Sequence, residues 1–156
     1  MRGWIKMAYI NAIQAADYIL FCANDAQELI TNLKLNKLLY YAQGYHIAIH
    51  DDLLFEDEIQ AWVHGPVVPN VYHKYKGFKW APINVNASRP ELSKEVFEFL
   101  DVIIETFLPI DAYKLELMTH EEKPWKNARS GLPKDALCQN TIEPTDMKEY
   151  FTLLMS

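Results

Sequence analysis

The chain has 156 residues, of which half are hydrophobic, 15 are Lys or Arg and 21 are Asp or Glu, so its formal charge at pH 7 is −6. This length and composition predict one domain with a single core. The negative charge argues against a general nucleic-acid-binding protein, because such proteins attract phosphates with a positive surface. No apolar run approaches the roughly 20 residues that span a bilayer, and the two cysteines, Cys22 and Cys138, lack a paired metal-ligand spacing. We therefore expect a cytoplasmic protein with free thiols and no membrane insertion.

The sequence leaves open whether Met1 or Met7 is the first residue of the native protein. Met1 is followed by Met7, after which a helical pattern begins. We expect residues 1–7 to be an N-terminal extension of little structural importance and residues 8–156 to form the single domain.

Two helices are predicted at the start of this domain. Asn11 can cap a helix over residues 12–24, in which apolar side chains recur at steps of three and four. Thr31 can cap a second helix over residues 32–49, whose leucines have the same periodicity. The two apolar faces are expected to pack against each other.

A small hairpin is predicted next. Short apolar runs at residues 53–55 and 59–63 flank three acidic residues, which favours two antiparallel strands joined by a solvated acidic turn. Gly65-Pro66 is expected to end the second strand. Pro69 suits the first turn of a short helix, and Gly77 can end it in the left-handed conformation.

The second half of the domain is predicted to be mostly helical. Ser88 to Glu91 has the spacing of a capping box before a long helix that ends at Phe107. The predicted segments are an extended piece at 81–86 and helices at 91–107, 111–118, 124–129 and from 145 onward. The fold class expected is mainly α (α+β), a compact helical domain with a two- or three-stranded antiparallel sheet.

Metal binding is not expected from the histidines. His46 and His50 have the i, i+4 spacing that can place two imidazoles on one metal, but no third ligand has a spacing that would bring it to them. The segment that begins at His120 superficially resembles a metalloprotease helix, yet its fifth position is Pro124, which is not a ligand and tends to break helices. We predict no metal site.

Catalytic motifs are also missing from the sequence. It has no Gly-x-Ser-x-Gly elbow, and no two of its five glycines have the spacing of a phosphate-binding loop. The adjacent acids at 51–52 and 56–58 are typical of solvated turns, whereas an acid–base pair needs burial of at least one carboxyl group. We therefore expect no catalytic residues, no cofactor and no enzymatic activity.

The stretch from Tyr72 to Trp80 interleaves lysines with aromatic residues, which suits contact with single-stranded nucleic acid. In a helix, however, Tyr72 and Tyr75 would face the core, and the acidic total charge would weaken binding of a polyanion. Nucleic-acid binding is therefore a weaker alternative.

Four sequence blocks occur in a fixed order between residues 10 and 129. They are KLNKLLYYAQ from Lys34, LLF with IQAW from Leu53, WVHGPVVPNVY from Trp62, and LMTHEEKPW from Leu117. Together they resemble the Panacea-domain family of phage-associated proteins, which includes GepA-like and SocA-like antitoxins, although many relatives carry Tyr or Asn in place of His64.

This resemblance implies an antitoxin of a bacterial or prophage toxin–antitoxin system. Such a protein binds and neutralises a cognate toxin by direct protein–protein contact, and the toxin is expected to be encoded by an adjacent gene. Relatives pair with unrelated toxins, so the resemblance implies a mode of action without identifying the partner. A SocA-like relative delivers its toxin to a protease, which makes a proteolysis adaptor the first alternative. An uncharacterised enzyme or a nucleic-acid-binding module is the second.

The resembling blocks contain both an expected binding surface and an expected scaffold. A Gly-Pro turn lets the backbone approach another chain, and large amphipathic side chains anchor interfaces. We predict partner binding by Lys34, Lys37, Tyr41, His64, Gly65, Pro66, Val67 and Tyr72. We predict structural roles for Leu35, Leu38, Leu39, Tyr40, Trp62, His120, Pro124 and Trp125.

Overall fold

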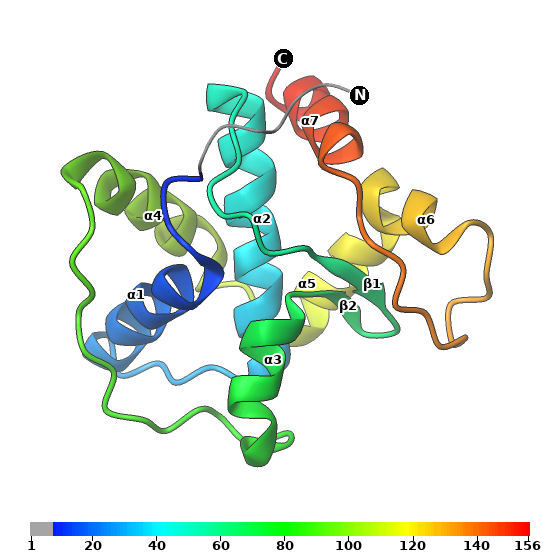
Figure 1. Ribbon diagram of the computed structural model, residues 1–156. Helices are drawn as coiled ribbons and strands as arrows, with labels where there is room; N and C mark the ends of the chain where they lie inside the picture. Colours follow the sequence, from blue (N-terminus) through cyan, green and yellow to red (C-terminus); the bar gives the residue numbers. More distant parts are fainter. Residues whose placement is uncertain (1–7) are drawn as a thin grey trace.

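Seven α-helices and a two-stranded antiparallel sheet make up the computed structural model, which describes residues 8–156 and is mainly helical, as predicted (Figure 1). The predicted extension at residues 1–7 lies outside the described residues. The elements are α1 (Ala12–Asp25), α2 (Asn32–His50), β1 (Gln60–Trp62), β2 (Gly65–Val67), α3 (Pro69–Tyr75), the short 3-10 helix η1 (Lys76–Phe78), α4 (Lys94–Phe107), α5 (Ala112–Glu121), α6 (Lys123–Arg129) and α7 (Pro144–Met155).

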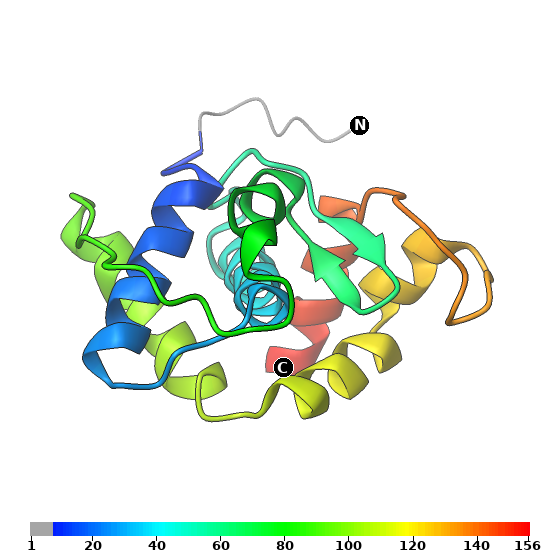
Figure 2. The same ribbon diagram turned by 90° about the horizontal axis from the view of Figure 1, so that it is seen from below.

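Helix α2 lies in the middle of the molecule. Seen nearly along its axis, it is surrounded by the other helices and the hairpin (Figure 2). Fourteen of its 19 residues are buried, so it has no continuous solvent-facing side, unlike an ordinary surface helix with one apolar stripe. Helices α1 and α4 lie on one side of it, and the hairpin, α5, α6 and α7 lie on the other (Figures 1 and 2).

The predicted caps of three helices are confirmed. Asn11 forms a capping box with Gln14 at the start of α1, and the Thr31 and Asp111 side chains accept backbone N–H bonds at the starts of α2 and α5. The predicted start of α4 was wrong, because Ser93 is its cap. The residues before Ser93 are not helical, and they hold the Arg89 guanidinium 3.9 Å from the centre of the Phe97 ring.

The predicted hairpin is displaced along the chain. Residues 53–55 form no strand, and the pairing runs from Gln60 opposite Val67 to Trp62 opposite Gly65. The Gly65-Pro66 pair was predicted to end the second strand, but it begins that strand in the structure. The reason is a side chain from α2: Gln43 accepts a bond from the Leu54 N–H at 2.8 Å and donates one to the Phe55 carbonyl at 2.7 Å. This segment thus has its backbone partners without a neighbouring strand.

Three further local predictions need correction. The residue with a positive φ in this segment is Lys79, at φ 54° after η1, and Gly77 lies within η1. Residues 81–86 form only an isolated bridge between Pro82 and Thr31, so they add no third strand to the sheet. The acidic turn is partly structural, because Asp57 accepts bonds from the backbone N–H of Ala12 at 3.0 Å and from the Asn70 amide at 3.0 Å.

Helices α2 and α7 pack closely because Gly44 has no side chain. The ring of Phe151 in α7 lies over Gly44 and contacts the rings of Tyr40 and Tyr45, with centroids 5.6 and 4.7 Å away. Buried Tyr41 stacks on Phe107 of α4, with ring centroids 4.2 Å apart. This aromatic cluster joins α2, α4 and α7 into one core.

Replacement of Gly44 by alanine is expected to destabilise the fold by about 2–3 kcal/mol, because its Cβ atom would overlap three ring atoms of Phe151. Urea unfolding followed by circular dichroism measures the change. Gly77→Ala is the matched control, since a Cβ atom there meets nothing within 4 Å. Equal stabilities of the two variants would contradict this packing.

Candidate partner-binding site

Two lysines predicted to contact a partner are buried in the scaffold. Lys34 is 8% exposed, and its Nζ donates to the Leu108 carbonyl at the end of α4, at 2.7 Å. Lys37 is 1% exposed, and its Nζ donates to the Leu33 carbonyl at 3.4 Å. Burial lowers the pKa of both amines, that of Lys37 to about 8, because the low-dielectric interior disfavours the ammonium form.

Lys37 lies directly beneath the hairpin. Gly65 adopts φ +122°, and a Cβ atom there would be 3.0 Å from Cε of Lys37 and 3.1 Å from Oγ1 of Thr119. Gly65 is therefore required by its backbone conformation and by the lysine below it. Its role in this structure is to let the hairpin pack on α2 and α5.

Tyr41, also predicted to bind a partner, faces a buried carboxylate. The hydroxyls of Tyr40 and Tyr41 donate to the two carboxyl oxygens of Glu122, at 2.8 and 2.9 Å. Burial raises the Glu122 pKa to about 7, and the two hydroxyl donors oppose this rise. Burial beside Glu122 raises the pKa of both tyrosines. The three groups join α2 to the start of α6.

Six of the eight residues predicted to bind a partner are buried in this conformation. Gly65, Pro66 and Val67 are buried along with Lys34, Lys37 and Tyr41. Their side chains are not accessible to a partner here. The remaining two, exposed His64 and partly buried Tyr72, line a cleft, and their role in binding stays a prediction.

The cleft that contains His64 and Tyr72 has a volume of about 940 Å³, and we call it the aromatic cleft. It lies between the hairpin, α3 with η1, and the loop that precedes α7. Its lining residues are Leu33, Trp62, Val63, His64, Tyr72, Lys76, Lys79, Trp80, Asp135, Leu137, Cys138 and Gln139.

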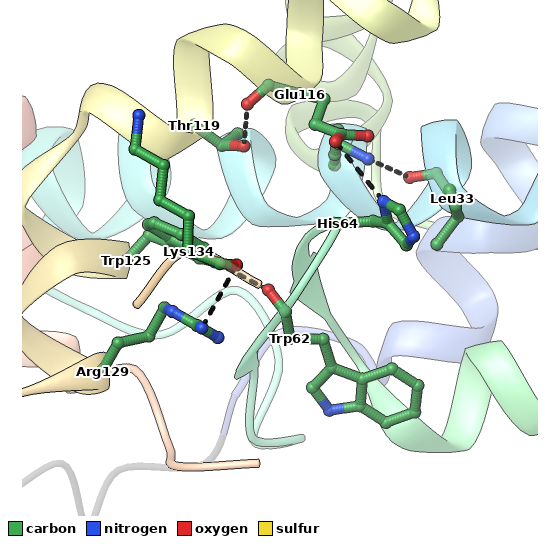
Figure 3. Close-up of polar contacts among 9 residues, drawn as sticks. Leu33, Trp62, His64, Glu116, Thr119, Trp125, Arg129 and Lys134 are labelled. Carbon is green, nitrogen blue, oxygen red and sulfur yellow. Dashed lines mark hydrogen bonds and ion pairs between the residues drawn. The ribbon is translucent and has the colours of Figure 1, made fainter. Parts of the chain in front are cut away.

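Aromatic rings form two edge-to-face pairs in this cleft. The Trp62 ring contacts Tyr72 with centroids 4.9 Å apart, and the His64 ring contacts Trp80 with centroids 5.7 Å apart. His64 also lies 3.4 Å from a carboxyl oxygen of Glu116 in α5 (Figure 3). Trp62, for which a structural role was predicted, is only partly buried, and its ring lines the cleft.

The other predicted structural residues support the hairpin from behind. The Trp125 indole donates to the Trp62 carbonyl at 2.9 Å, and the His120 ring stacks on Trp125 with centroids 4.2 Å apart. In Figure 3 the Trp62 carbonyl faces Trp125, whereas its indole ring points away from it. Pro124 is buried at the start of α6. Leu35, Leu38, Leu39 and Tyr40 are fully buried in the core.

Arg129 was missed by the sequence reasoning and is the largest of the fully buried side chains within residues 8–156. Its guanidinium donates to the Ala61 carbonyl of β1 at 3.0 Å and to the Pro133 and Ala136 carbonyls at 2.8 and 2.6 Å. It lies 4.6 Å from the centre of the Trp125 ring. Arg129 therefore fixes the loop that forms one wall of the aromatic cleft. An arginine near a helix end gave no sequence signal for burial.

Lys76, Lys79, Trp80 and Leu137 were also missed as site residues. They are exposed, and Trp80 and Leu137 are 71% and 91% exposed despite their large apolar side chains. The alternation of lysines and aromatics from Tyr72 to Trp80 was a signal for the first three. Nothing in the sequence around Leu137 indicated that it would lie beside them.

Neither a metal cluster nor a membrane-spanning helix is found in the part of the chain that the structure describes. Within residues 8–156, no three His, Cys, Asp or Glu side chains are grouped to hold a metal ion. The His46 ring lies beside that of His50, 4.6 Å between centroids, and its Nδ1 contacts the Asp52 carbonyl at 2.8 Å. No helix among these residues combines the length and apolar character needed to cross a membrane.

Comparison with protein families gives one match over more than half of the chain. The model described as "Antitoxin SocA-like, Panacea domain" matches residues 35–126. The match contains the hairpin and α3 with η1, which form two sides of the aromatic cleft, whereas residues 135–139 lie beyond it. Comparison with curated proteins and with solved structures gave no significant match.

Replacement of Lys37 by methionine is expected to stabilise the protein by about 1–3 kcal/mol at pH 7. Methionine has an unbranched side chain of similar shape, and the substitution removes the buried ammonium group. The folded pKa of about 8 lies below the usual 10.5, so the cost of charging Lys37 is complete below pH 8 and vanishes above 10.5. The gain should shrink as pH rises between these values. Urea unfolding at several pH values measures it. Exposed Lys94→Met is the control, and an equal effect there would contradict the prediction.

Glu122→Gln tests the buried carboxyl group. Because the folded pKa of about 7 exceeds the usual 4.5, the stability that protonated Glu122 provides is complete below pH 4.5 and is lost as pH rises through 7. The variant should lack this loss, and its stability relative to wild type should increase by about 2–3 kcal/mol from pH 5 to 8. Denaturant unfolding across this range checks it. A similar increase in exposed Glu121→Gln would contradict the assignment to Glu122.

Proposed function

This chain belongs to the family of SocA-like antitoxins with a Panacea domain, and on this premise we propose that it neutralises a cognate toxin by direct protein–protein binding. Family membership supports an antitoxin-type role in general. The observation that supports binding is the aromatic cleft, where large apolar side chains are exposed on a fixed framework. Exposed groups of this kind are typical of protein interaction sites.

Neutralisation is proposed to occur by occlusion of the toxin's active surface. An interface of ordinary size buries about 1,200–2,000 Å² in total, which is more than the cleft alone can provide. The cleft would therefore be the centre of a larger contact. We propose that the protein performs no chemistry on its partner and that the two proteins meet in the cytoplasm. The buried ionisable groups Lys37 and Glu122 support this interpretation, because both serve contacts within the scaffold.

Co-expression with the toxin-like product of an adjacent gene tests this function. In a host whose growth that product arrests, the chain is expected to restore growth and to co-purify with an inactive variant of the toxin. Because occlusion leaves the toxin intact, its level should not fall when the chain is present. The fold of the expressed chain is checked by circular dichroism.

Two results would count against the proposal. A folded chain that neither restores growth nor co-purifies with the toxin would reject the antitoxin function for this pair. Restored growth together with disappearance of the toxin would reject occlusion and favour a proteolysis adaptor.

A further inference from the structure

Most of the residues that line the aromatic cleft have apolar or aromatic side chains. Leu33 and Val63 line it together with the rings of Trp62 and Tyr72, and its volume of about 940 Å³ is within the range of small-ligand and peptide pockets. Trp80 is 71% exposed at its rim, where burial against a partner would remove a large apolar surface from water. The cleft can therefore accept at least one large apolar side chain.

Two lysines line the aromatic cleft although the chain carries a net charge of −6. They are Lys76 and Lys79, and Asp135 is the one acidic residue among the lining residues within 8–156, while Glu116 lies outside the lining, 3.4 Å from the His64 ring. No acidic side chain in the described part of the chain forms an ion pair with either lysine. These two ammonium groups complement carboxylates on a partner.

Several features favour a polypeptide over a nucleic acid as the occupant. Single-stranded nucleic acids stack on open ring faces, but edge-to-face pairing covers one ring face in each of the pairs Trp62–Tyr72 and His64–Trp80. The net charge of −6 repels a polyanion along its whole length, whereas a segment with one or two carboxylates carries only as much charge as the two lysines can balance.

We propose that the aromatic cleft binds a short acidic segment of the partner, in which a large apolar side chain is flanked by carboxylates. The apolar group enters between Trp62, Tyr72 and Trp80, and the carboxylates meet Lys76 and Lys79. This inference rests on the proposed function, because it names the part of the toxin that the cleft recognises. The donors from Trp125 and Arg129 hold the walls before binding, which reduces the entropy lost on association.

Binding of a defined peptide to the full chain tests the cleft directly. The probe is a capped hexapeptide with Leu-Phe at its centre, one glutamate on each side of this pair and a glycine at each end, and its counterpart with two lysines in place of the glutamates is the control. The readout is the indole N–H signals of Trp62 and Trp80 in ¹⁵N NMR spectra, assigned with Trp→Phe variants. Saturable shifts of these signals by the glutamate peptide are expected, with about tenfold weaker binding of the lysine peptide.

A charge-reversal variant shows whether the two lysines are responsible. Lys76→Glu with Lys79→Glu is expected to weaken the glutamate peptide about tenfold. The matched control is Lys94→Glu with Lys114→Glu, which makes the same change in net charge at exposed positions on α4 and α5. Trp80→Ala is expected to weaken the peptide as well, with little effect on stability, because Trp80 is exposed.

Three outcomes would overturn the inference. They are no shift at about 1 mM peptide, equal weakening by the two charge-reversal pairs, and tighter binding of single-stranded oligothymidylate than of the peptide at the same indoles. Failure of this inference is distinguishable from failure of the proposed function by co-expression. If a Lys76→Glu/Lys79→Glu variant restores growth and binds the toxin as well as wild type, recognition of the toxin by the aromatic cleft is rejected. The antitoxin function itself is then not contradicted.

Discussion

Hydrogen bonding by the polar side chains of the buried helix α2 is the constraint on which the rest of the structure depends. A helix with neighbours on every side leaves the backbone ends of those neighbours without water, and each must find a partner. Asn36 accepts from the backbone at the start of α3, Gln43 from the segment before β1, and Lys34 donates to the end of α4. Tyr40 and Tyr41 bind the carboxylate at the start of α6. The polar residues of α2 therefore position four surrounding segments.

This constraint explains why the KLNKLLYYAQ block from Lys34 does not line the aromatic cleft. The lysines and tyrosines of α2 have the chemistry of an interface, but their functional groups are directed inward at backbone carbonyls and a buried carboxylate. Residues on which the family resemblance rests thus serve the scaffold of this chain. The exposed side chains that line the cleft come from turns, loops and the short helix η1 instead. They include His64 in the hairpin turn, Lys76, Lys79 and Trp80 after α3, and Leu137 in the loop before α7.

Local signals in the sequence predicted the helices well and the contacts between them poorly. A cap such as Asn11 acts within one turn, so its residue type and spacing are sufficient to place the start of a helix. The hairpin could not be placed in this way, because Gln43 supplies backbone bonds to residues 11 and 12 positions later in the chain. Arg129 is similar, since its acceptors include Ala61, 68 positions earlier. Such partners depend on the tertiary fold, and composition or periodicity does not contain them.

The hairpin shows how the scaffold controls the site. Two strands of three residues have little stability alone, so the position of this sheet must come from its surroundings. Lys37 and Thr119 support it from below, and Trp125 and Arg129 donate to its carbonyls. Asn140 accepts from the Ala61 N–H of β1, and the Ile142 N–H donates to Ile59 just before this strand. None of the residues that make these contacts to the hairpin is among those that line the aromatic cleft, so they hold its walls without occupying the space inside. The conformational entropy of the cleft walls is therefore already lost when the protein folds. Less entropy is lost when a partner binds, so more of the free energy of its contacts contributes to affinity.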